Sequence, residues 1–111
     1  MIRSSPFEIN SELNGDEARL ALAGELDIAT VQRLEEAVEN VLRRGARTVI
    51  VDLSGLAFMD SSGLRLIITL NERAGADGWT LALIKPPRSS FSVFEITGAD
   101  ANLPFIEDSS P

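Results

Sequence analysis

Histidine, cysteine and tyrosine are absent from the sequence, and these absences exclude most of the chemistry that enzymes use. Without histidine the chain has no Ser-His-Asp or Cys-His triad and no imidazole ligand for a metal ion. Without cysteine it has no zinc-binding thiolate, no redox pair and no disulfide. The side chains left for chemistry are carboxylates, hydroxyls, nine arginines and one lysine, Lys85. We therefore expect a protein that is not an enzyme and uses no cofactor.

Positive charge and long apolar runs are also scarce. Ten basic residues stand against seventeen acidic ones, which gives a formal net charge of −7, whereas phosphate backbones and anionic membranes attract basic surfaces. No window approaches the roughly 20 apolar residues of a membrane-spanning helix. We expect a cytoplasmic protein with no direct nucleic-acid partner and no membrane partner, whose mature chain begins at Met1.

The length and composition are typical of one soluble globular domain. The chain has 111 residues, of which 44% are hydrophobic and 24% are charged. It shows no internal repeat, no linker and no low-complexity segment. We expect one domain over residues 1–111, with loose ends at residues 1–5 and 107–111.

Hydrophobic patterning predicts four or five strands. Apolar and polar residues alternate in residues 7–13 and again around Leu20 and Leu22, with Asn14-Gly15 between them, as in an antiparallel hairpin. The β-branched run at residues 48–53 and the apolar run at residues 79–84 are typical of central strands covered on both faces. A short edge strand is expected at residues 103–106, because Pro104 is tolerated only at an edge.

Helical periodicity separates these strands. Residues 30–44 and 62–74 each place apolar residues on one helical face, and residues 90–97 form a shorter helix that follows two prolines. Strands that alternate with helices form parallel sheets. The predicted fold is therefore an α/β domain with a mixed four- to five-stranded sheet, an antiparallel N-terminal hairpin and flanking helices.

Three segments are candidates for a functional site, because sites in α/β sheets gather where strands end and helices begin. They are residues 24–27, 52–55 and 58–63, and we expect them at one end of the sheet. In the third, Asp60 and Ser61 are good N-caps for the next helix. Gly63 is costly inside a first helical turn, so we expect a partner surface or a phosphate to approach it closely. The adjacent hydroxyls of Ser61 and Ser62 suit a phosphoacceptor position.

The segment Gly-Glu-Leu-Asp at residues 24–27, together with Phe-Met-Asp-Ser-Ser-Gly-Leu at residues 58–64, resembles the STAS domain of bacterial anti-sigma factor antagonists. The resemblance covers nearly the whole chain, although family members usually continue into one more helix. It implies that Ser61 is phosphorylated by the anti-sigma factor, a serine kinase with a histidine-kinase-like ATPase fold, and dephosphorylated by a metal-dependent serine phosphatase. It also implies that the unphosphorylated protein binds the anti-sigma factor and frees a sigma factor.

The resemblance suggests a partner-binding surface, and each of its residues also has a structural interpretation. The surface comprises Glu25, Asp27, Asp60, Ser61, Ser62, Gly63 and Leu64. Asp27 either lies near the serine or caps the helix at residues 30–44. Glu25 is expected to be a solvated loop charge and Leu64 a core residue. Arg65, Glu72 and Arg73 are expected to form a solvated helix face.

Three alternative functions remain open. Asp52 and Lys85-Pro86 superficially resemble the phosphoacceptor and lysine of a receiver domain, although the acidic pair that holds magnesium there is missing. Ser61 or Ser62 could serve as a nucleophile only if Lys85 supplied the base. STAS domains also occur as stress-complex scaffolds, lipid-transport accessory subunits and nucleotide-binding modules.

Overall fold

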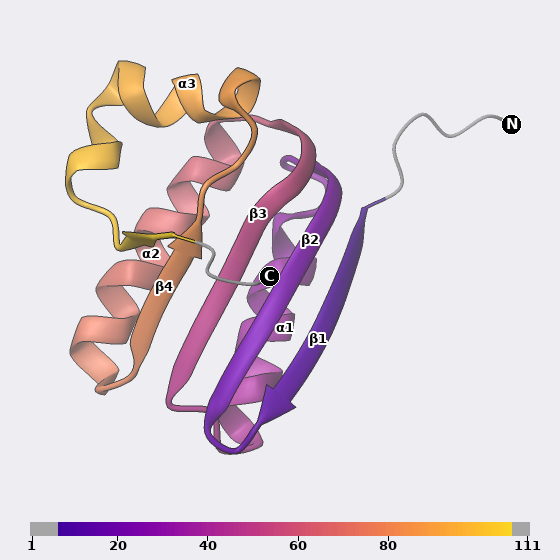
Figure 1. The fold of residues 1–111 in the computed structure, drawn as a ribbon, viewed down its shortest axis with the longest axis vertical. Helices are drawn as coiled ribbons and strands as arrows, with labels where there is room; N and C mark the ends of the chain where they lie inside the picture. Colours follow the sequence, from indigo (N-terminus) through magenta and orange to yellow (C-terminus); the bar gives the residue numbers. More distant parts are fainter. Residues whose placement is uncertain (1–6, 108–111) are drawn as a thin grey trace, which may run out of the picture.

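The computed structural model describes residues 7–107, and its strands alternate with helices as predicted (Figure 1). The loose ends expected at residues 1–5 and 108–111 lie outside the described residues, and Glu107 is exposed. The elements, in chain order, are β1 (Glu8–Asn14), β2 (Glu17–Leu26), α1 (Val31–Arg43), β3 (Thr48–Met59), α2 (Ser61–Asp77), β4 (Thr80–Ile84), α3 (Arg88–Thr97), the 3-10 turn η1 (Ala99–Ala101) and β5 (Phe105–Ile106).

The five strands form one mixed sheet in the order β1-β2-β3-β4-β5. β1 pairs with β2 in antiparallel register, and the three other pairings are parallel. Figure 1 shows α1 and α2 together behind the sheet, while α3 lies beyond the upper ends of β3 and β4. The predicted α/β fold with an N-terminal hairpin is confirmed. Within residues 7–107 the two long helices lie on the same face of the sheet and no helix covers the other face of the central strands, so the expectation that these strands are covered on both faces is wrong.

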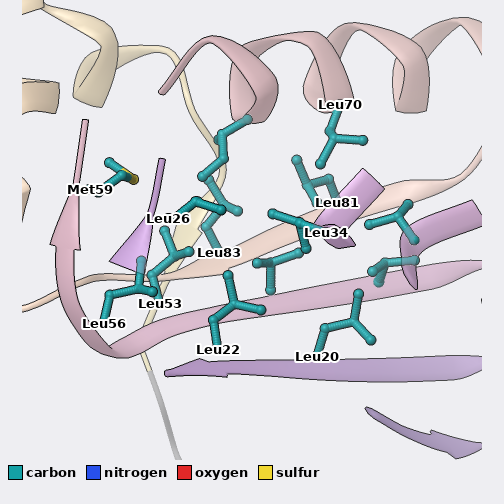
Figure 2. Packing of buried hydrophobic residues seen from close by; sticks show 14 of the residues in the cluster. Leu20, Leu22, Leu26, Leu34, Leu53, Leu56, Met59, Leu70, Leu81 and Leu83 are labelled. Atoms are coloured by element: carbon teal, nitrogen blue, oxygen red, sulfur yellow. The ribbon is translucent and has the colours of Figure 1, made fainter. Parts of the chain in front are cut away.

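The hydrophobic core lies between the sheet and the two long helices. Alternate residues of β2 and β3 point into it, so that Leu20 and Leu22 are buried with Val49 and Val51. Figure 2 shows Leu70 of α2 and Leu34 of α1 among the leucines of the strands. Burial of these side chains supplies most of the free energy that holds both helices on the sheet.

The hairpin turn lies one residue later than expected. Asn14 pairs with Glu17, so the two loop residues are Gly15 and Asp16 instead of Asn14 and Gly15. Gly15 has φ +62°, and the non-glycine residues of the described chain all have negative φ. Glycine at the first loop position with a negative φ at the second is the pattern of a type II′ turn.

β3 runs six residues beyond the predicted strand, so the expectation that a strand ends at residues 52–55 is wrong. Two irregularities in its pairing with β2 add a residue to β3 at each point, between Ala21 and Ala23 and between Gly24 and Glu25. Gly55 allows the first, because a Cβ there would lie 2.6 Å from the carbonyl oxygen of Leu22. Bulges increase strand twist and redirect side chains, and here they carry β3 onward to the start of α2.

Aromatic side chains attach the C-terminal elements to the sheet. Phe94 of α3 is fully buried, and its ring centroid lies 5.3 Å from that of Phe105 in β5 and 5.7 Å from that of Phe91. Phe91 and Phe105 also meet edge to face, with centroids 5.5 Å apart. Such pairs stabilise beyond their area of burial, so this cluster holds α3 against β5 at the edge of the sheet.

Candidate functional site

β2 and β3 end side by side, which brings two of the three candidate segments together. Leu26 pairs with Met59, and the backbone N–H of Asp60 donates to the carbonyl oxygen of Leu26 at 3.2 Å. The turn after β2 and the first turn of α2 therefore share one end of the sheet, as predicted. Asp52 is set apart from them within β3.

Asp60 is the N-cap of α2. Its backbone is extended, and its Oδ1 accepts hydrogen bonds from the N–H groups of Ser62 at 2.8 Å and Gly63 at 3.3 Å. These bonds satisfy two of the amides that a helix leaves free at its N-terminus. Ser61, which was also a candidate N-cap, is instead the first residue of the helix.

The two serines differ in accessibility. Ser61 is exposed, and its hydroxyl makes no hydrogen bond with any of residues 7–107. Ser62 is half-buried and turns toward the side of α2 that faces α1, where it lines a hollow with Ile28 and Val31. Ser61 is therefore the more accessible hydroxyl for an enzyme or a partner.

Gly63 faces the interior. It is buried, and a Cβ on it would lie 2.7 Å from Cγ of Met59 and 3.0 Å from Cδ2 of Leu26. The close approach inferred from the sequence exists, but the approaching surface is formed by the ends of β2 and β3 and not by a partner. The expectation that a partner surface or a phosphate explains this glycine is therefore wrong, and a larger residue here would collide with the protein's own core.

A direct test compares the same substitution at two glycines of α2. Gly63→Val should lower the free energy of unfolding by about 1–3 kcal/mol, because the added methyl groups overpack the core beneath the helix. Gly75→Val should change it by no more than about 0.5 kcal/mol, because a Cβ at Gly75 would meet nothing within 4 Å. Urea unfolding measures both; equal effects at the two positions would contradict the packing role of Gly63.

The other candidate residues divide between the core and the surface. Leu64 is buried, as expected. Asp27 is not the cap of α1, because the N-cap of that helix is Thr30. In the turn before the helix, the Oδ1 atom of Asp27 accepts a hydrogen bond from the N–H of Ala29 at 3.0 Å. Glu25 is half-buried within β2 opposite Phe58, rather than in a solvated loop. Asp27 and Glu25 thus border the end of the sheet from which α2 starts.

The structure adds two exposed apolar side chains that the expected partner-binding surface did not include. Ile28 is 76% exposed in the turn after Asp27, and Phe58 is 47% exposed near the end of β3. A large apolar residue directly after Asp27, in a segment with neither strand nor helix periodicity, was the available signal for Ile28. Exposed apolar side chains beside a candidate site are typical of contact surfaces between proteins.

Two hollows flank the first turns of α2. One, of about 450 Å³, lies toward α3 and η1; the other, of about 420 Å³, lies toward α1. Arg65 and Thr69 line both hollows, whereas Ser61 lines only the first.

Arg73 was expected on a solvated helix face, but it joins α2 to α1. Its guanidinium nitrogens lie 3.4 Å from a carboxylate oxygen of Glu35 and 3.5 Å from one of Glu39.

Asp52 belongs to a separate polar cluster on β3. Its Oδ2 lies 2.8 Å from a guanidinium nitrogen of Arg19, and its Oδ1 accepts from both the N–H and the hydroxyl of Ser54.

Within residues 7–107 no group of three acidic residues is arranged to hold a metal ion. In the same range no helix is long and apolar enough to cross a membrane.

Comparison with known proteins identifies the class to which this architecture belongs. The family model described as "Mlab, STAS domain" matches residues 9–107. The fold is also that of solved anti-sigma factor antagonists. A structure from Mycobacterium paratuberculosis aligns with a TM-score of 0.80 and 21% identity over 94% of this chain and 88% of that one. SpoIIAA in its unphosphorylated form aligns with a TM-score of 0.75 and 22% identity over 95% and 90%.

The chain belongs to the STAS-domain family. Its curated relatives include the anti-sigma-B factor antagonist of Staphylococcus aureus, 32% identical over 69% of this chain and 71% of that protein. The anti-sigma-F factor antagonist RsfB of Mycobacterium tuberculosis is 34% identical over 52% of this chain, and the match spans only about half, 48%, of RsfB.

Proposed function

We propose that this protein is a cytoplasmic anti-sigma factor antagonist controlled by phosphorylation of Ser61. In the unphosphorylated form it binds an anti-sigma factor that is also a serine kinase with a histidine-kinase-like ATPase fold, and the sigma factor is released. The kinase transfers the γ-phosphoryl group of its nucleotide to the Ser61 oxygen, which loses its proton. A metal-dependent serine phosphatase hydrolyses the phosphoserine and restores binding.

The observation that carries the proposal is the hydroxyl of Ser61 at the start of α2, which is exposed and has no hydrogen-bond partner within residues 7–107. Asp60 holds the first turn of the helix without help from this hydroxyl, so modification breaks no hydrogen bond within residues 7–107. Glu25, Asp27 and Asp60, with Ser62 and the buried Gly63 and Leu64 behind them, form or support the proposed partner surface. SpoIIAA has also been solved in its phosphorylated form, and that structure aligns with this chain with a TM-score of 0.70 and 22% identity.

The surroundings of Asp52 weigh against a receiver-like function. Both of its carboxylate oxygens are engaged, one by Arg19 and the other by Ser54. A phosphoacceptor aspartate needs a free oxygen for attack and a metal ion beside it. The arrangement instead suits a structural ion pair.

Lys85 is poorly placed to activate a serine nucleophile. Its ammonium group lies 5.0 Å from the centroid of the Phe91 ring, which is a cation–π distance. A general base needs hydrogen-bond contact with the hydroxyl, and within residues 7–107 no direct hydrogen bond joins Lys85 to Ser61.

The experiment is affinity capture of the tagged protein from cells of its source organism, followed by mass spectrometry of the captured proteins and of the peptide that contains residues 60–64. We expect an ATPase-like anti-sigma factor and a phosphate on Ser61. Phosphate on Ser62 instead would move the modification site by one residue. An unmodified peptide, together with a bound lipid or nucleotide, would favour a STAS scaffold or ligand-binding module.

A further inference from the structure

Arg65 is an exposed cation one helical turn after Ser61. It is four residues further along α2, and no ion pair or hydrogen bond joins it to any other residue in the described range 7–107. Two other helical arginines are engaged, since Arg33 donates to the carbonyl oxygen of Phe7 at 2.9 Å and Arg73 pairs with two glutamates of α1. The side chains of Arg43 in α1 and Arg88 in α3 have, like that of Arg65, no such partner within residues 7–107. Within residues 7–107 the guanidinium of Arg65 is therefore available to a charged group added nearby.

The geometry directs Arg65 toward Ser61. Residues four apart are neighbours on a helix surface, and helical side chains lean toward the N-terminus of their helix. Ser61 and Arg65 line the same hollow between α2 and the segment formed by α3 and η1. An acidic group placed N-terminal to a basic group at this spacing is also the more favourable orientation.

The nearby carboxylates have other partners. Asp60 accepts from two N–H groups of α2. Glu35, which lines the second hollow with Arg65, lies 3.4 Å from Arg73. A phosphate on Ser61 would add up to about two negative charges directly beside Asp60. Arg65 is the cation of this helical turn that can balance them.

We infer that Arg65 is the internal counter-ion of the phosphorylated form: its guanidinium donates hydrogen bonds to the phosphate on Ser61 and holds it over the hollow between α2 and α3. This inference rests on the proposed modification of Ser61. Arginine suits the role because its planar fork donates two parallel hydrogen bonds to a phosphate. Before phosphorylation Arg65 has no ion-pair partner among residues 7–107, and after it Arg65 acts as a positioning residue for the phosphate.

The test uses the full chain with phosphoserine incorporated at position 61 during synthesis, so that it needs no kinase. The second ionisation of the phosphate is followed by ³¹P NMR between about pH 4 and pH 8. With Arg65 present, the pKa of the phosphoserine should be about half a unit lower than in Arg65→Gln, because a nearby cation favours the dianion. Arg65→Lys should retain part of the shift.

Arg47→Gln is the matched control, since it removes the same charge from an exposed arginine just before β3, at the opposite end of that strand from Ser61. It should leave the phosphoserine pKa unchanged. Equal pKa values in the parent chain and Arg65→Gln would overturn the inference. That result would leave the proposed function intact. The proposed function is contradicted by a different result, namely that phosphoserine at position 61 does not weaken partner binding.

Discussion

Ser61→Asp is expected to weaken binding to the captured anti-sigma factor while the protein folds normally. Two like charges about 4 Å apart at an effective dielectric near 20 repel by about 4 kcal/mol. A hundredfold loss of affinity requires only about 2.7 kcal/mol. One carboxylate carries less charge than a phosphate, so we expect a loss of about tenfold or more, measured by titration calorimetry with the purified partner.

Ser61→Ala and Ser62→Ala complete this experiment. Ser61→Ala should abolish phosphorylation and keep full affinity, because the Ser61 hydroxyl has no hydrogen-bond partner in residues 7–107 and Asp60 caps the helix alone. The sigma factor should then be released constantly. Ser62→Ala should still be phosphorylated on Ser61. Undiminished affinity of Ser61→Asp, with its helix content intact, would argue that Ser61 lies outside the interface.

Phe94→Ala should cause the largest loss of stability that we predict. Phe94 of α3 is fully buried, and its ring packs against those of Phe91 in the same helix and Phe105 in β5. Truncation of a buried phenylalanine costs about 3–5 kcal/mol through lost burial and the cavity that remains. A domain whose total stability is about 5–15 kcal/mol would lose much of it. Urea unfolding followed by circular dichroism measures the change.

Ile96→Ala is the control for this prediction. Ile96 lies in the same helix but is 84% exposed, so its truncation should alter the free energy of unfolding by at most about 0.5 kcal/mol. A similar small change for Phe94→Ala would show that the aromatic cluster does not hold α3 and β5 on the sheet.

Local patterning predicted most of the fold because each element carries its own period. The helix expected at residues 30–44 is α1, Val31–Arg43, and the strand expected at residues 79–84 is β4, Thr80–Ile84. The far half of β3 escaped prediction. Ser54-Gly55 resembles a turn in sequence, and only the pairing with β2 shows that Gly55 is needed where the Leu22 carbonyl comes close.

The candidate site shows the same division between local and tertiary information. Capping by Asp60 follows from short-range chemistry, and the structure confirms it. The reason for Gly63 is tertiary, since the side chains that exclude a Cβ come from the ends of two strands, at Leu26 and Met59. Sequence reasoning located the close approach but could not tell an internal surface from an external one.

The central claim is that phosphate on Ser61 switches off partner binding. The most direct measurement is the Kd of the partner for the chain with phosphoserine at position 61 and for the unmodified chain, in the same buffer and at the same salt concentration. We predict a Kd at least about a hundredfold higher for the phosphorylated form. Equal Kd values for the two forms would contradict the account.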